Sequence, residues 1–202
     1  EVFDLLKNFK YIIPQGSPNF TLFSGITSQN AQVVNNLSFS SNKSLKLTNG
    51  SNIDFNISRE ISEDDVARVQ WKMYIPKGKS GKIGLETNNA SNNAFYFEVL
   101  DGQLSVFSLG NNGYTKVWAE NLIENRWINF SIIFQPFENE IEFWMDYIPV
   151  LILKNYQSNK IEDLNFSSIT NSNNNEFYID DLCYKEWNRI FPCTAQYEPV
   201  CI

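Results

Sequence analysis

The residues best suited to chemistry lie in one short segment, Glu140–Asp146. In an extended strand, side chains two positions apart share a face, so Glu140, Glu142 and Asp146 would lie on one side. Glycoside hydrolases use a pair of carboxyl groups, one as nucleophile or base and one as acid. Here Trp144 stands between Glu142 and Asp146, and the more economical interpretation is a solvated polar face.

The chain of 202 residues contains no histidine. Histidine is the commonest general base and the commonest metal ligand, so Ser-His-Asp and Cys-His triads are excluded. The three cysteines, Cys183, Cys193 and Cys201, lack the spacing of a zinc finger. They allow three disulfide pairings, among which spacing does not choose. Because three is an odd number, at least one cysteine is expected to be free, paired elsewhere or paired with a partner beyond this chain. The sequence therefore predicts a protein that is not an enzyme.

The composition limits the classes of molecule that the protein is expected to bind. The formal net charge is -7, which disfavours nucleic acid and anionic membrane surfaces. No apolar run is long enough to span a bilayer, so membrane insertion is not expected. Aromatic residues make up 15% of the chain, and flat rings pack well on pleated sheets.

Period-two alternation of apolar residues dominates the chain, as Val69–Ile75 shows. Such alternation is typical of strands with one face on a core. Strands are predicted at Ser44–Leu47, Asn52–Ile57, Val69–Ile75, Lys82–Glu86, Ala94–Leu100, Gln103–Leu109, Ile128–Phe134, Ile141–Asp146, Val150–Lys154 and Phe177–Asp180.

Turn residues separate these runs. Asp101-Gly102 lies between two predicted strands and is a strong signal for a two-residue hairpin. Ser62–Ala67 carries a helix-cap pattern but is predicted as a turn that leads into a strand. Short strands at this spacing predict an all-β fold, a two-sheet antiparallel β-sandwich of the jelly-roll type. The sandwich is expected over residues 1–185, followed by a Cys-containing tail at 186–202.

Four segments carry a family resemblance: Asn42–Leu47, Asn125–Ser131, Glu140–Val150 and Phe177–Leu182. In order and spacing they resemble a concanavalin-A-like lectin/glucanase jelly roll, a group that includes laminin-G-like domains and carbohydrate-binding modules. The resemblance covers about Phe3–Tyr184 and implies a secreted or cell-surface protein. Glucanases of this group place two glutamates around an aspartate on one strand, and Glu140–Asp146 departs from that pattern.

The tail carries a second resemblance. Pro192–Cys201 is similar to the opening of a Kazal-like protease-inhibitor module. The chain stops where that module would continue, so inhibition is not implied.

Aromatic residues on the polar side of the predicted strands are the candidate ligand-binding groups. Such rings stack on sugar faces, while carboxylates nearby read the hydroxyl groups. Tyr114 and Trp118, in or just after a Gly/Asn loop, are expected to form a rim. If a second layer covers this face, the same rings are ordinary packing, and that alternative stays open. The predicted ligand-binding residues are Tyr74, Tyr96, Tyr114, Trp118, Glu142, Trp144, Asp146 and Tyr178.

The resemblance also implies a structural calcium ion. Relatives hold one with an early acidic residue, backbone carbonyls and an aspartate of the last strand. Asp181 occupies the matching late position. Lys10 stands where the early carboxylate is expected, and Asp4 or Asp54 would have to replace it.

Three functional hypotheses follow. The leading one is a non-catalytic extracellular carbohydrate-binding or adhesion module whose ligand is a glycan. The second is a structural building block of a cell-surface filament or large adhesin, which contacts neighbouring surface proteins. The third is a glycoside hydrolase. Exposed aromatic rings would favour the first, and an apolar edge strand would favour the second.

Overall fold

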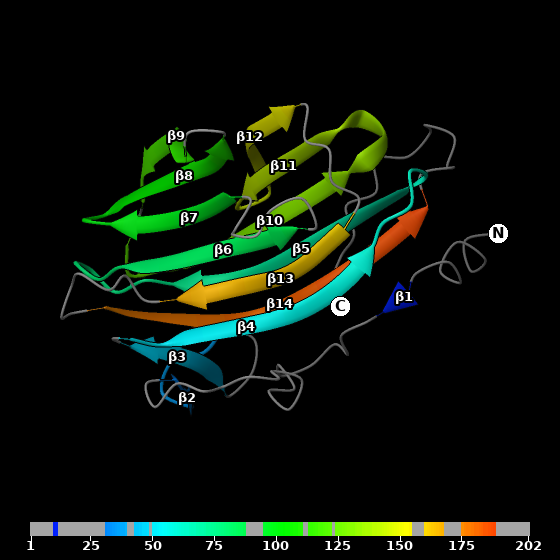
Figure 1. Ribbon diagram of the computed structural model, residues 1–202. Helices are drawn as coiled ribbons and strands as arrows, with labels where there is room; N and C mark the ends of the chain where they lie inside the picture. The colour runs from blue at the N-terminus through cyan, green and yellow to red at the C-terminus, as the bar shows by residue number, and fades with distance from the viewer. Residues whose placement is uncertain are drawn as a thin grey trace.

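The computed structural model describes residues 10–11, 31–39, 43–48, 50–87, 95–110, 113–122, 124–154, 160–167 and 175–188. These residues form two antiparallel β-sheets that pack face to face (Figure 1). The predicted all-β, two-sheet antiparallel β-sandwich is therefore confirmed. In the described part of the chain, helix is limited to the 3-10 turn η3 (Pro136–Glu138). No described helix is long and apolar enough to cross a membrane.

The larger sheet has the strand order β12-β11-β10-β5-β14-β3-β2, and β1 pairs with β14 beside this path. Long-range pairing therefore places β5 in the middle of the sheet, between β10 and β14. The strands are β1 (Lys10–Tyr11), β2 (Ala31–Val34), β3 (Ser44–Thr48), β5 (Asp65–Tyr74), β10 (Trp127–Gln135), β11 (Glu140–Met145), β12 (Ile148–Lys154) and β14 (Glu176–Asn188).

The smaller sheet has the order β4-β13-β6-β7-β8-β9. Its strands β6 to β9 follow one another as hairpins, while β13 inserts between β4 and β6. Asp101 and Gly102 close the β7–β8 hairpin with positive φ angles, as predicted. The strands are β4 (Asn52–Glu60), β6 (Gly81–Thr87), β7 (Phe95–Leu100), β8 (Gln103–Gly110), β9 (Gly113–Asn121) and β13 (Lys160–Ser167).

Each predicted strand range overlaps an observed strand. Of the predicted turn at Ser62–Ala67, residues 62–64 lie in the turn before β5, and 65–67 already belong to β5. Strands β1, β2, β9 and β13 were not predicted. Strand β9 lies at a sheet edge and is mostly exposed, so its sequence lacks the alternation of a half-buried strand. In β13 a bulge between Ile161 and Asp163 interrupts the alternation. Strand β14 runs to Asn188, past the predicted domain boundary at 185.

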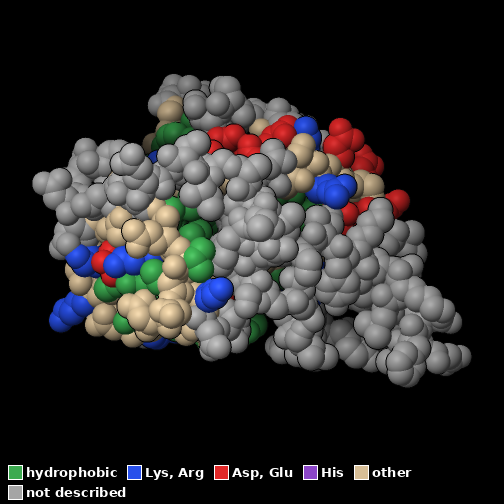
Figure 2. Space-filling model, turned by 90° about the horizontal axis from the view of Figure 1, so that it is seen from below, with side chains coloured by type: hydrophobic (Ala, Val, Ile, Leu, Met, Phe, Trp, Pro, Cys, Tyr) green, Lys and Arg blue, Asp and Glu red, His purple; other side chains and the backbone are tan. Residues whose placement is uncertain are grey.

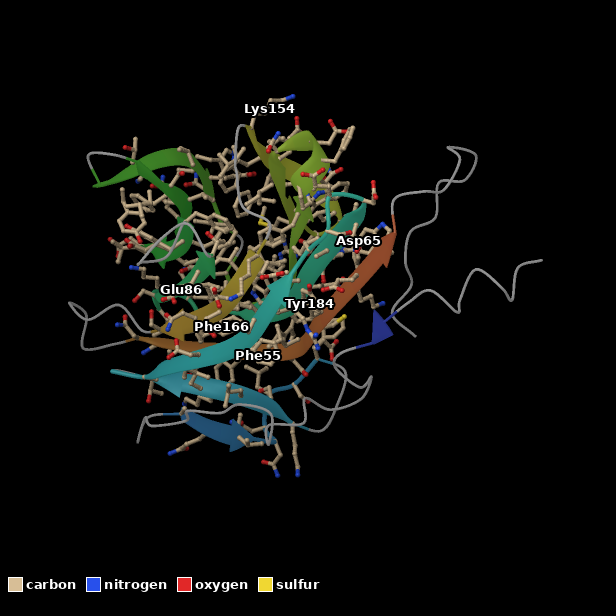
Figure 3. All side chains as sticks on the ribbon, turned by 45° about the vertical axis from the view of Figure 1, so that its right-hand side comes forward. Phe55, Asp65, Glu86, Lys154, Phe166 and Tyr184 are labelled. Carbon is tan, nitrogen blue, oxygen red and sulfur yellow. The ribbon has the colours of Figure 1, made fainter. Side chains whose placement is uncertain are left out.

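The core lies between the sheets and is rich in aromatic rings. Trp71 on β5 is fully buried; it stacks on Phe130 of the same sheet and meets Phe97 and Phe166 of the opposite sheet edge-on. Aromatic pairs of this kind contribute about 0.5–1.5 kcal/mol beyond their buried area. Figure 3 shows Phe166 beside strands of the smaller sheet and Tyr184 on β14 of the larger sheet. This rigid core fixes the positions of the side chains on both outer faces.

Charge is unevenly distributed over the surface. Figure 2 shows acidic side chains gathered toward one side of the face seen from below. Lysine, arginine and hydrophobic side chains mix elsewhere on the same face. The net charge of -7 therefore does not describe every part of the surface.

Candidate functional site

The predicted ligand-binding residues lie on three different surfaces of the sandwich. One group occupies the outer face of the larger sheet: Tyr74, Glu142, Trp144, Asp146 and Tyr178. Tyr96 and Tyr114 lie on the outer face of the smaller sheet, and Trp118 points inward. These residues therefore do not share one surface, because the two outer faces are separated by the core.

Trp118 packs against the hydrophobic core and does not form the predicted rim. A β-bulge between Val106 and Phe107 shifts the register, so Trp118 pairs with Val106 while Lys116 pairs with Phe107. Directly opposed residues in an antiparallel pair point to the same face. Because Val106 is buried, its partner Trp118 also faces the core.

The three acidic residues of Glu140–Asp146 are held by neighbouring side chains. Both carboxylate oxygens of Glu142 accept hydrogen bonds, one from Gln135 and one from the Trp144 indole at 2.7 Å. Two ion pairs hold the others, Glu140 with Lys154 at 2.8 Å and Asp146 with Arg126 at 2.6 Å. These contacts give all three carboxylates a role in holding strands β10 to β12 together.

A lysine clamped between two aromatic rings is the most distinctive feature of the larger sheet's outer face. The Lys72 ammonium lies 4.4 Å from the ring centroid of Phe39 and 5.4 Å from that of Tyr147. It also donates a long hydrogen bond of 3.4 Å to the Tyr147 hydroxyl. Lys72 is only 8% exposed, whereas Phe39 is 52% and Tyr147 56% exposed. We call these three residues the Lys72 clamp.

A row of rings continues from the clamp across three adjacent strands. Trp127 on β10 lies opposite Tyr74 on β5, and Tyr74 lies opposite Tyr178 on β14. The ring centroids are 5.6 Å and 6.0 Å apart in these pairs, and Phe39 meets Trp127 edge-on at 6.2 Å. We call Trp127, Tyr74 and Tyr178 the aromatic row. With the clamp it forms a continuous series of ring contacts, in which Tyr74 and Trp127 are half-buried and Tyr178 is buried.

Tyr147 reaches Lys72 from a strained backbone position. Asp146 and Tyr147 connect β11 to β12 as a two-residue hairpin turn, with φ angles of 48° and 67°. Turns of this type favour Asn or Asp followed by Gly, because a Cβ is disfavoured at positive φ. Asp146 fixes the turn to β10: its N–H donates to the Asn129 carbonyl at 2.8 Å, and its carboxylate accepts from the Asn129 N–H at 3.0 Å.

Phe39 is anchored to a distant strand. Its N–H donates to Asp180 Oδ2 at 2.8 Å, and Asp180 Oδ1 accepts from the N–H of Asp181 at 2.8 Å. Asp180 is fully buried and lies opposite Lys72 on β14. Both rings of the clamp are therefore placed by hydrogen bonds of their own backbone segments.

Buried polar side chains form a floor beneath the clamp. Gln70, Asn129, Arg68 and Ser131 point outward from β5 and β10, yet all are buried. Gln70 Nε2 donates to Asn129 Oδ1 at 2.8 Å, and Arg68 donates to the Ser131 hydroxyl at 3.1 Å. We call these four residues the polar floor. Its hydrogen bonds fix the amide groups next to Lys72.

Tyr178, at the far end of the aromatic row, donates a hydrogen bond from its hydroxyl to the Glu176 carboxylate. Burial acts to raise the pKa of Glu176, but hydrogen bonds from Tyr178 and Lys46 and the charge of Lys46 bring it below its ordinary value. Burial and the Glu176 carboxylate raise the pKa of Tyr178. Glu176 therefore stays ionised and Tyr178 stays protonated near neutral pH.

The smaller sheet carries a second aromatic group, but its ring faces are occupied. Tyr96 stacks on Phe107 with centroids 4.7 Å apart, and Tyr114 meets Tyr96 edge-on at 4.8 Å. The ammonium of Lys82 lies 3.8 Å from the Tyr96 ring, and that of Lys116 lies 5.4 Å from the Phe107 ring. Lysines lie over rings on both sheets, but Tyr114 is 38% exposed, against 52% for Phe39 and 56% for Tyr147. The larger sheet is therefore the better candidate.

Four residues of the clamp and the aromatic row are absent from the predicted ligand-binding residues: Phe39, Lys72, Trp127 and Tyr147. Trp127 directly precedes the alternating run of β10, and its side chain points away from the core. Tyr147 occupies the place where a hairpin sequence favours glycine, and this signal could have identified it. Phe39 carries no local signal, because its position depends on Asp180, 141 residues away.

The predicted calcium site remains a prediction. Among the described residues, no three Asp, Glu or Cys side chains converge as a metal site would require. Asp181 lies in the β14 bulge with a φ of 51°. Lys10 pairs with Glu186 rather than lying beside Asp181. The described carboxylates alone therefore do not fit a calcium ion at Asp181.

The cysteine predictions concern mostly the undescribed tail. Cys183 lies half-buried on β14 opposite Gln70. Cys193 and Cys201 lie outside the described residues, so the disulfide pairings stay predictions. The Kazal-like segment also lies outside them.

Comparison with known proteins shows the fold. No protein-family model matches the chain, and no match was found among curated proteins. Three similar solved structures are a sialidase (TM-score 0.51, 12% identity), the receptor binding domain of botulinum neurotoxin D (0.56, 13%) and that of botulinum neurotoxin mosaic serotype C/D (0.52, 14%). The matches cover 89%, 82% and 76% of this chain.

The chain spans 17% of the sialidase and 44% and 40% of the two neurotoxin domains. At these identities the likeness shows a shared β-sandwich and nothing of the whole proteins' activities. The described part of the chain therefore has the fold of one unit within those longer chains.

Proposed function

We propose that this protein is a non-catalytic carbohydrate-binding module, and that glycan binds on the outer face of the larger sheet. The observation that carries the proposal is the pair of exposed rings, Phe39 and Tyr147, held at fixed positions around Lys72. Sugar rings present apolar C–H faces that pack on aromatic rings, while side-chain polar groups bind the hydroxyls.

The site is preorganised for this task. Hydrogen bonds from Asn129 fix the Tyr147 turn, and Asp180 fixes Phe39. Binding therefore does not have to order the two rings, and the entropy cost of association is lower. The Arg126–Asp146 ion pair lies half-exposed beside Tyr147 and supplies polar groups at the edge of the rings.

We also place the protein in the concanavalin-A-like group of β-sandwiches and at a secreted or cell-surface location. The order of the four resembling segments supports the first statement, and their positions fall on β3, β10, β11–β12 and β14. The similarity to two receptor binding domains supports a binding role. The ligand of those proteins is not carried over.

The test is a glycan-array screen of the purified chain with Phe39→Ala and Tyr147→Ala. Each substitution should weaken binding by about tenfold or more, as loss of a stacking ring does. Phe137→Ala is the matched control, because Phe137 is an exposed ring in η3, at the opposite end of β10 from Trp127. Binding that survives both clamp substitutions, or no binding at all by a folded sample, would contradict the proposal.

A structural role is the second candidate, and strand β12 favours it. It is an edge strand of the larger sheet whose Ile148 and Ile152 are exposed. Figure 3 shows Lys154, the last residue of β12, projecting at the rim of the sandwich. Unpaired apolar edges are templates for pairing with another chain. Self-association measured by light scattering, abolished by Ile152→Lys, would support this role.

A further inference from the structure

We propose that the Lys72 clamp and the adjacent Asn129 bind an oxyanion group of the glycan, a carboxylate or a sulfate ester. The ligand class is therefore an acidic glycan. This inference rests on the proposed carbohydrate-binding function and adds the chemistry that selects among glycans.

The first support is the hydrogen bonding of Lys72. An ammonium group carries three N–H donors. Among the described residues, its one hydrogen-bond acceptor is the Tyr147 hydroxyl, at a long 3.4 Å. Ring faces attract the charge but accept no strong hydrogen bond. A nearly buried ammonium in such surroundings gains most from an anionic acceptor, since charge-assisted hydrogen bonds are roughly twice as strong as neutral ones.

The second support is an unsatisfied donor beside it. Asn129 lies directly opposite Lys72 on β10 and is 2% exposed. Its Nδ2 has no hydrogen-bond partner among the described residues. Turning both the Asn129 and Gln70 amides over would leave the Gln70 NH2 group unpaired instead, so either arrangement leaves one amide donor available. Buried polar groups are nearly always hydrogen-bonded, so a spare donor here points to an absent acceptor.

The two neighbouring carboxylates already accept hydrogen bonds from other groups. Asp180 accepts two backbone N–H groups, from Phe39 and Asp181. Asp146 accepts the Asn129 N–H and forms the ion pair with Arg126. These contacts bring oxygens of the two carboxylates to backbone amides and to Arg126. A lysine ammonium is a compact point charge, so it accommodates the planar carboxylate and the tetrahedral sulfate alike.

The experiment uses the full chain and two matched pairs of polymers. Polygalacturonate is compared with its methyl ester, and dextran sulfate with unmodified dextran, by biolayer interferometry. We expect one acidic polymer of the two pairs to bind about tenfold or more tightly than its neutral match, in line with a charged hydrogen bond. The preference should weaken with added salt. The pair that shows it identifies carboxylate or sulfate.

Variants assign the preference to the clamp. Lys72→Met should reduce the affinity for the acidic polymer to that for its neutral match, and Lys72→Arg should restore the preference in part. The control is Lys116→Met, which removes an equal charge from a lysine that also lies over a ring, on the opposite face. The salt dependence of the wild-type chain provides a measurement that does not depend on variant folding.

The outcomes separate the two proposals. Equal binding of acidic and neutral polymers, or a preference that survives Lys72→Met, overturns the oxyanion inference and leaves the carbohydrate-binding function standing. Displacement of an acidic polymer by sodium sulfate or sodium acetate at equal anion concentration means that the site takes a free anion, which also overturns it. No binding of any polymer or array glycan overturns both.

Discussion

The ring of Tyr147 lies over the Lys72 ammonium, 5.4 Å from centroid to Nζ, although its backbone has a φ of 67°. A non-glycine residue in this left-handed region costs about 1–2 kcal/mol. Residues in such conformations concentrate at binding sites, where the surrounding structure holds them. The backbone conformation that costs stability at Tyr147 is therefore the one that places its ring in the proposed binding site.

The first prediction separates the strain of Tyr147 from its ring. Tyr147→Gly removes both, so we expect the free energy of unfolding to rise by about 0.5–1 kcal/mol, since part of the relieved strain is offset by the lost cation–π contact. Tyr147→Ala keeps the strained backbone but loses the ring, so it should lower the free energy of unfolding. Both variants should lose glycan binding equally. Urea denaturation and binding measurements check the two quantities, and a Gly variant less stable than the Ala variant would contradict the account.

The second prediction concerns Trp118. Because the β8–β9 bulge turns it toward the core, Trp118→Ala should lower the free energy of unfolding by about 2 kcal/mol and leave glycan binding unchanged. Tyr114→Ala, four residues away on the same strand but exposed, should lower the free energy of unfolding by only about 0.5–1 kcal/mol, through its lost edge-on contact with Tyr96. Thermal and urea unfolding of both variants measure this. Equal effects would mean that Trp118 does not pack inward.

The alternation of apolar residues was sufficient to predict the sandwich and most of its strands. In Val69–Ile75 it also identified the inward set correctly, because Val69, Trp71, Met73 and Ile75 are all buried. Bulges were the main source of error. Because Val117 is an additional residue in β9, the side chains that follow it point to the opposite face from the one that alternation predicts. Nothing in the local sequence marks this shift.

The candidate site was predictable only in part. The alternation of apolar and polar residues along each strand predicted that Tyr74, Tyr178 and Tyr96 all point away from the core. It does not reveal which sheet a strand joins, so it did not separate Tyr96 from the other two. Sheet membership follows from the strand order, in which β5 and β14 are neighbours although about a hundred residues separate them in the chain. Phe39 depends on the same long-range pairing. Binding sites assembled across non-consecutive strands therefore escape local sequence patterns.

The third prediction concerns two glutamates with opposite pKa shifts. Because folding lowers the pKa of Glu176, its carboxylate stabilises the fold above the unfolded value of 4.5, and this contribution is lost as the pH falls through the folded pKa. Burial, then Asp163 and Asp54, raise the pKa of Glu86, so its ionisation costs stability as the pH rises through the folded pKa.

At neutral pH, Glu176→Gln should therefore lower the free energy of unfolding and Glu86→Gln should raise it. Each change should be no more than about 0.5–1 kcal/mol, because solvent screens both partly exposed groups. Both differences from the wild type should disappear well below pH 4.5. Denaturation series at neutral and acidic pH provide the measurement. Changes of the same sign in the two variants would show that the assigned surroundings are wrong.

The fourth prediction tests the close approach of the two sheets. A Cβ at Gly81 on β6 would lie 2.8 Å from Cδ1 and 3.0 Å from Cγ of Phe177, a ring of β14 that is fully buried. Since that ring has no room to move, Gly81→Ala should lower the free energy of unfolding by about 1–3 kcal/mol. Gly78→Ala is the control: nothing lies within 4 Å of its added Cβ, and its φ of 71° alone should cost about 1 kcal/mol. Phe177→Leu combined with Gly81→Ala should recover part of the loss, because the smaller side chain gives the Cβ room. If Gly81→Ala proves as stable as the wild type, the sheets must lie farther apart at this point than described.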